Sequence, residues 1–94
     1  MKTAENNSLK NKDDLTAINS RLKRAHGQMG AVIRMLEEGR SCEDIVTQMA
    51  AVSKAINTAA FSLISSSLKE CIADNKKNSS EVTEKLQKLF LTLA

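Results

Sequence analysis

A chain of 94 residues forms one domain at most and buries a small share of its surface, so association with further copies is expected. It contains no Pro and three Gly, which leaves little turn chemistry for β-hairpins. It has no Trp or Tyr, which disfavours the aromatic platforms of single-strand nucleic-acid binders. Its one His disfavours a His-rich metal site. The net charge of +3 arises in residues 1–40, with eight Lys/Arg and five Asp/Glu, against six and six in residues 41–94. The sequence predicts an all-α protein, and its basic first half leaves duplex DNA possible as a partner.

The first predicted helix runs over residues 13–36. Residues 1–12 are polar and lack periodicity, so we expect them to form a mobile tail, with Asp13 or Asp14 as the helix N-cap. Apolar residues then recur at alternating spacings of three and four, which is typical of a narrow helical seam. The seam residues are Leu15, Ile18, Leu22, Ala25, Met29, Val32 and Leu36.

A second predicted helix follows Gly39, which is expected to end the first because glycine tolerates the left-handed conformation. Ser41 is expected to be its N-cap, with Asp44 at the third helical position as in a capping box. The helix should run to about residue 73, which gives a rod of about 45 Å. Its apolar stripe is Ile45, Met49, Val52, Ile56, Ala59 and Leu63.

A short third helix is expected after a polar loop at residues 74–80, with Ser79 or Ser80 as its cap. Its inward-facing residues should be Val82, Leu86, Leu89, Phe90 and Leu93. Two long antiparallel helices and a short third cannot cover their own apolar stripes. We therefore expect residues 13–94 to form one helical domain, which completes its core by dimerisation and by stacking of two dimers into a tetramer.

Two cysteines lie on one face of the second helix. Cys42 and Cys71 are 29 positions apart, which places them within about 20° around the helix but about 43 Å apart along it. A disulfide needs Cα atoms within about 7 Å, so joint chemistry requires a second chain, whose antiparallel helix brings its Cys71 level with Cys42. Ser67 lies one turn before Cys71 on that face. Cys42 is expected to attack first, because it follows the cap Ser41 where the helix dipole favours thiolate.

The alternative for both cysteines is that they are small packed hydrophobic residues. The chain shows no signal peptide and no long apolar run, so a reducing cytoplasm is expected rather than a disulfide scaffold. No Ser/His/Asp set, phosphate loop or carboxylate pair suggests an enzyme. His26 is expected to be solvated, and Met29, Met35 and Met49 to be packing residues.

Basic residues of the first helix fall on two sides. Arg21, Arg24 and Gln28 share one flank, and Lys23 and Arg34 lie on the opposite flank. By themselves such residues more often form a solvated charged face than a DNA-binding surface.

Residues 21–56 resemble the CsoR/RcnR family of ligand-sensing repressors, whose first helix typically reads R-L-x-R-x-x-G-Q and whose second begins near a Cys. The residues that match at their spacings are Arg21, Leu22, Arg24, Gly27, Gln28, Cys42, Gln48 and Cys71. The resemblance covers about residues 13–94. It implies a three-helix protomer, an antiparallel dimer, a disc-shaped tetramer and DNA binding without a helix-turn-helix.

The resemblance also implies which residues contact DNA. It favours Arg21 most strongly, with Arg24, Gln28, Lys23 and Arg34 as further candidates. Where the family often carries a second basic residue, on helix two, this chain has Thr58. Lys54, one turn earlier, is the expected substitute.

Copper sensors of this family bind Cu(I) with the first Cys and, from the partner chain, a His and the second Cys. In this chain Ser67 stands where that His should be, and a serine hydroxyl is a poor Cu(I) ligand. Ser41 likewise replaces a Tyr that is common before the first Cys. Two cysteines without the His resemble the persulfide-sensing, CstR-like branch, in which reactive sulfur links the paired thiols as a di- or polysulfide.

We therefore expect a DNA-binding repressor with no resident cofactor. It should hold operator DNA while Cys42 and Cys71 are reduced and release it when reactive sulfur crosslinks them between protomers. One alternative is a Cu(I) sensor that uses the two thiolates. Another is a helical interaction protein with no DNA role.

Overall fold

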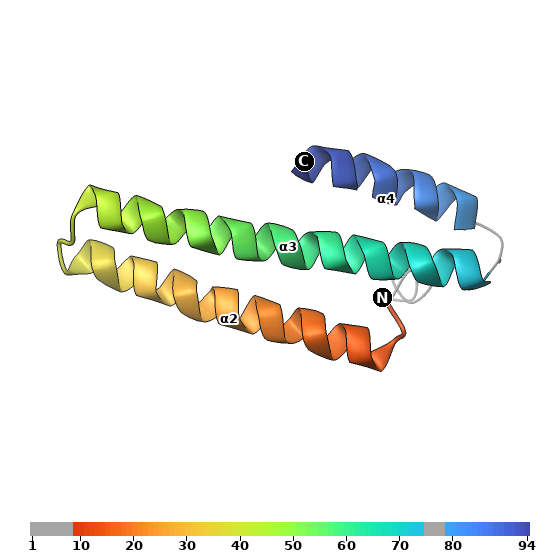
Figure 1. Ribbon diagram of the computed structural model, residues 1–94, viewed down its shortest axis with the longest axis horizontal. Helices are drawn as coiled ribbons and strands as arrows, with labels where there is room; N and C mark the ends of the chain where they lie inside the picture. The colour runs from red at the N-terminus through yellow and green to blue at the C-terminus, as the bar shows by residue number, and fades with distance from the viewer. Residues whose placement is uncertain (1–8, 75–78) are drawn as a thin grey trace.

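The computed structural model describes residues 9–74 and 79–94, without the side chains of residues 71, 72, 74 and 79. These residues form three helices, α2 (Lys12–Glu37), α3 (Cys42–Asp74) and α4 (Ser79–Leu93). Helices α2 and α3 form a long antiparallel hairpin, and α4 folds back along α3, so that α3 lies between the other two (Figure 1). The described part measures 53 × 25 × 22 Å and contains no strand, which confirms the all-α prediction.

The start of α2 differs from the prediction. Asn11 is the N-cap, and its side-chain oxygen accepts a hydrogen bond of 2.9 Å from the backbone N–H of Asp14. The expected caps, Asp13 and Asp14, were wrong and lie instead in the first turn, where the helix dipole favours their negative charge. An asparagine caps as well as an aspartate, so the helix begins earlier, at Lys12.

Residues 9–11, which were expected to belong to the tail, contact the helices, and Lys12 of the expected tail already begins α2. Leu9 is buried against Ile18 of α2 and Ala59 of α3. The Glu70 carboxylate accepts hydrogen bonds of 2.8 to 3.1 Å from the backbone N–H groups of Lys10 and Asn11. Residues 1–8 of the expected tail lie outside the described residues.

The turn between α2 and α3 follows the predicted chemistry. Gly39 has a φ of 72°, in the left-handed region, and the Arg40 N–H donates to the Met35 carbonyl at 3.0 Å, as in a Schellman motif. Ser41 then caps α3 by accepting a 3.2 Å hydrogen bond from the Asp44 N–H. Both predictions are confirmed, and the second fixes Cys42 as the first residue of α3.

In the core of the hairpin, about half of the predicted apolar residues of each helix are buried. Ile18, Ala25 and Val32 are buried on α2, at steps of seven residues. The α3 residues buried at the same steps are Ile45, Val52 and Ala59. The remaining seam residues of α2 are 43% to 61% exposed, namely Leu15, Leu22, Met29 and Leu36. Two helices can cover only the sides that face each other, so the other half of the seam lies at the surface.

Helix α4 packs on α3 at the side away from α2 (Figure 1). The rings of Phe61 and Phe90 meet with their centroids 5.1 Å apart. The expectation that Leu89 faces inward was wrong, because it is 54% exposed; Phe90 is 44% exposed despite this contact. The expected loop at 74–80 is shorter, since Asp74 still belongs to α3 and Ser79 already belongs to α4, and residues 75–78 lie outside the described residues.

Candidate functional site on the helix hairpin

The hairpin has two flanks of different chemistry. Arg21 lies three residues after the buried Ile18 and Leu22 lies four after it, so the two side chains leave α2 on opposite sides of the core. On α3, Ser62 and Leu63 are related in the same way to the buried Ala59. One flank is therefore apolar and the other polar.

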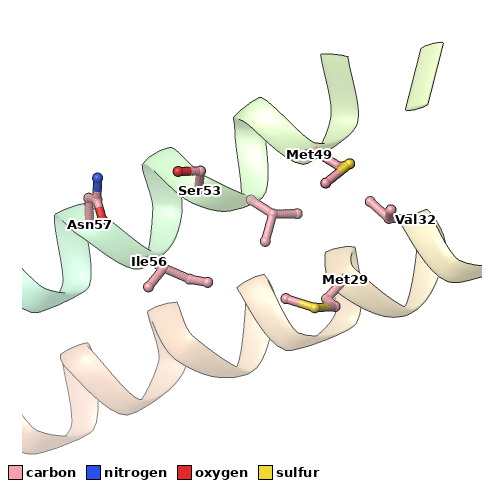
Figure 2. Close-up of a pocket in the computed structure, with 7 residues that line it drawn as sticks. Met29, Val32, Met49, Ser53, Ile56 and Asn57 are labelled. Atoms are coloured by element: carbon pink, nitrogen blue, oxygen red, sulfur yellow. The ribbon is translucent and has the colours of Figure 1, made fainter. Parts of the chain in front are cut away.

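The apolar flank carries a groove of about 280 Å³, the apolar groove. Its lining residues include Met29, Val32, Met49, Ser53, Ile56 and Asn57. Figure 2 shows Met29 and Val32 of α2 across from Met49 and Ile56 of α3. Met29, Met49 and Ile56 are 39% to 52% exposed, whereas Met35 is partly buried in the core as a packing residue.

Cys42 lies at the end of the apolar flank. It is the first residue of α3, it is a free thiol and it is exposed. Met49, Ile56 and Leu63 follow it at steps of seven residues, which return to nearly the same side of the helix. Ser41, which was expected near the sensing site, uses its hydroxyl to cap α3 and so holds the position of Cys42.

The structure keeps the two cysteines of one chain apart. Both belong to α3, an unbroken helix of 33 residues, so their separation along its axis is about 43 Å. Ser67 is half-buried near the far end of this helix. The side chain of Cys71 lies outside the described part, whereas its backbone belongs to α3. Chemistry that involves both thiols therefore needs two chains.

The polar flank collects most of the residues predicted to contact DNA. Arg21 and Arg24 are exposed, and Gln28 is half-buried with its side-chain oxygen buried and without a hydrogen-bond partner. On α3, Lys54 and Ser65 are eleven residues apart and share a side within about 20°, so the exposed Lys54 faces this flank too. Lys23 and Arg34 are exposed but lie elsewhere on α2, as does the exposed His26.

Arg21 also lines a second groove, the polar groove, of about 390 Å³ between α2 and α3. Its lining includes Asp14, Arg21, Phe61, Ser62, Ser65 and Ser66. Sequence reasoning missed the three serines. A signal was available, because serine is less favourable than alanine inside a helix and several serines on one side indicate a polar surface.

Comparison with known proteins identifies the family of this chain. The family described as metal-sensitive transcriptional repressor matches residues 14–92. A copper-sensing transcriptional repressor, CsoR of Bacillus subtilis, is 38% identical over 77 residues, which cover 82% of this chain and 73% of that protein. The copper-sensing transcriptional repressor RicR of Mycobacterium tuberculosis is 38% identical over 52 residues, which cover 55% of this chain and 54% of RicR.

The search of solved structures gave no match. No helix within residues 9–74 and 79–94 is long and apolar enough to cross a bilayer. The family and both relatives are transcriptional repressors rather than enzymes. The chain belongs to the family of metal-sensitive transcriptional repressors, in agreement with the CsoR/RcnR-like motif of its first helix.

Proposed function

We propose that this repressor senses reactive sulfur. While Cys42 and Cys71 are reduced, it holds operator DNA through the polar flank. When a persulfide or polysulfide crosslinks Cys42 of one protomer to Cys71 of another, it releases the DNA. The observation that carries the proposal is the placement of two cysteines on one unbroken helix, with Cys42 exposed at its first residue and Ser67 where a nitrogen ligand would be needed.

An antiparallel dimer through the apolar flank supports this chemistry. The midpoint of the interval 42–71 falls between Ile56 and Asn57, and both residues line the apolar groove. A two-fold axis at this point brings Cys42 level with the partner's Cys71, which gives two equivalent sites. The same contact covers exposed apolar side chains of both helices, including Met29, Met49 and Leu63. A dimer of such dimers gives the proposed tetramer.

The proposed reaction has two steps. The Cys42 thiolate takes the outer, sulfane sulfur of a low-molecular-weight persulfide, the S–S bond of that persulfide breaks, and the corresponding thiol leaves. The Cys71 thiolate of the partner then attacks the Cys42 sulfur and expels hydrosulfide. The product is an intersubunit disulfide. Two thiols are oxidised, the sulfane sulfur is reduced to sulfide, and no third ligand or metal is required.

The experiment combines intact mass with operator binding. A duplex is first selected from random-sequence DNA by the reduced protein. Polysulfide should then produce a reductant-sensitive covalent dimer and abolish binding to this duplex. Cys71→Ala should stop at a persulfide on Cys42 without a crosslink, and Cys42→Ala should react little, because it lacks the exposed thiol that attacks first. Retention of the duplex by the fully crosslinked protein would contradict the proposal.

A Cu(I) sensor is the second candidate, because both named relatives are copper-sensing repressors. The donor set of this chain fits a three-coordinate Cu(I) site poorly, since Cys42 and Cys71 supply two thiolates and Ser67 supplies a hydroxyl. Cu(I) is therefore included in the same binding assay. Tight Cu(I) binding that releases the duplex, together with no response to polysulfide, would establish the copper function and exclude sulfur sensing.

A further inference from the structure

The polar groove joins a guanidinium to a row of hydroxyls. Arg21 extends from α2 on one side, and Ser62, Ser65 and Ser66 line the groove from α3. Arg21 and Ser65 are exposed, while Ser62 and Ser66 are half-buried, so all four can be reached from solvent. The resemblance to the repressor family singles out Arg21 but assigns nothing to the three serines.

These serines carry a cost for helix formation. Serine is a weaker helix former than alanine, because its hydroxyl competes for backbone hydrogen bonds. Alanine at positions 62, 65 and 66 would therefore strengthen α3 and leave the hairpin core unchanged. Their hydroxyls are hydrogen-bond donors that face a groove whose cation is Arg21. A planar guanidinium with hydroxyl donors opposite it suits the oxygen atoms of a phosphate group.

We propose that the polar groove binds one backbone phosphate of duplex DNA. Arg21 supplies the positive charge, and Ser62 and Ser65 donate hydrogen bonds to the phosphate oxygens. This inference rests on the proposed function, because it takes DNA binding by the polar flank as given. Arg24 and Lys54 on the same flank then contact neighbouring phosphates, which places the duplex across both helices of the hairpin.

Asp14 restricts which phosphate the groove accepts. Its carboxylate lines the same groove two helical turns before Arg21. A phosphodiester carries one negative charge, whereas a phosphate monoester carries about 1.5 to 2 at pH 7 and free phosphate also carries more than one. The carboxylate repels the second charge, so the groove favours the diester of a nucleic-acid backbone over small phosphate anions.

The test measures affinity for the selected duplex as a function of salt. The Ser62→Ala/Ser65→Ala variant should bind about tenfold more weakly, because hydrogen bonds to a charged group are lost. The slope of log affinity against log salt should stay unchanged, since no charge is removed. Arg21→Ala should instead lower that slope by about one. Thr16→Ala, which removes an exposed hydroxyl of α2 outside both grooves, is the matched control and should bind as the parent does.

A charged pair of variants isolates the groove. Ser62→Asp places a carboxylate at the proposed phosphate site and should weaken DNA binding on the order of a hundredfold, since like charges in contact repel strongly. Thr16→Asp adds the same charge to an exposed position of α2 about 140° around the helix from Arg21, and should change affinity by less than about threefold. Far-UV circular dichroism verifies that each variant keeps its helices.

A double-mutant cycle decides whether the groove residues share one phosphate. Combining Arg21→Ala with Ser62→Ala/Ser65→Ala should cost less than the two separate losses together, because the same contact is removed twice. If the losses of affinity are fully additive, or if the serine variant binds DNA as the parent does, the proposed phosphate site is wrong, although the parent still binds DNA. Displacement of the duplex by inorganic phosphate at constant ionic strength would also overturn it. Failure of the parent to bind any duplex would instead remove the proposed function.

Discussion

The apolar and polar flanks are built by the same two helices, yet they differ in what they leave exposed. The apolar flank presents Met29, Met49 and Ile56 around its groove and ends at Cys42. The polar flank presents Arg21 and a row of serines, with Gln28 on the same side of α2. A shift of one residue along each helix, from Leu22 to Arg21 and from Leu63 to Ser62, moves from one flank to the other. A hairpin of two helices can therefore keep the proposed protein-binding surface apart from the proposed DNA-binding surface without a second domain.

The largest effect is expected from a charge in the middle of the apolar flank. Ile56→Asp places a carboxylate at the proposed two-fold axis, where an unpaired buried charge costs several kcal/mol. The protein should become monomeric, lose the polysulfide crosslink and bind DNA at least about a hundredfold more weakly. Sedimentation analysis measures the association. An Ile56→Asp protein that still forms the parent oligomer would show that this flank is not the interface.

The chemistry of the apolar flank can be changed by one ligand. Ser67→His puts an imidazole one turn before Cys71, which completes a set of two thiolates and one nitrogen. Cu(I) affinity should rise by at least about tenfold to a hundredfold, because loss of a group that only hydrogen-bonds to a metal ligand already changes metal affinity by this much. Competition with a Cu(I) chelator measures the affinity. Ser66→His, one position away on α3, is the control and should leave Cu(I) affinity near that of the parent.

On the polar flank, charge removal should weaken DNA binding without affecting association. Each of Arg21→Ala and Arg24→Ala should lower affinity about fivefold near physiological salt and reduce the salt slope by about one. Lys23→Ala, whose side chain leaves α2 on another side, should have a smaller effect. Fluorescence anisotropy across a salt series gives both quantities. Unaltered affinity and slope in the double Arg variant would refute the assignment of this flank to DNA.

The smallest expected effect lies at the end of the hairpin that both flanks share. Asn11→Ala removes the side-chain acceptor for the Asp14 N–H and should lower the free energy of unfolding by about 1 kcal/mol. Thermal denaturation at fixed protein concentration measures the change. Asn19→Ala, at an exposed position inside α2, makes the same substitution without a cap and should not destabilise the fold. Equal melting temperatures for Asn11→Ala and the parent would contradict the capping role.

Features set by neighbouring residues could be predicted from the sequence, and features set by distant ones could not. The Gly39 turn and the Ser41 cap depend on residues within one helical turn, so local chemistry was sufficient. The burial of Leu9 depends on Ala59, fifty residues further along, and periodicity gave no sign of it. Likewise, the serines could be related to Arg21 only once α3 was placed beside α2.

The division of each apolar seam is also a tertiary property. The heptad spacing predicted that both Ile18 and Leu22 belong to the seam of α2. Which of them is buried depends on the side from which α3 approaches, and the structure buries Ile18 and leaves Leu22 at the surface. Cys42 could be placed from sequence at a helix start and on a face that borders the apolar stripe, but which part of that stripe stays exposed required the hairpin.

Hydrogen bonds to Glu70 fasten the open end of the hairpin. The Gly39 turn joins the end of α2 to the start of α3, and Glu70 joins the backbone of Lys10 and Asn11 to the last turns of α3. The two helices are thus connected at both ends of the hairpin. As a result, α2 cannot slide along α3 or rotate against it without breaking the hydrogen bonds to Glu70. Cys71 follows Glu70 directly, so a change at this proposed sensing residue would occur next to the carboxylate that holds the start of α2, about 15 Å along the helix from Arg21.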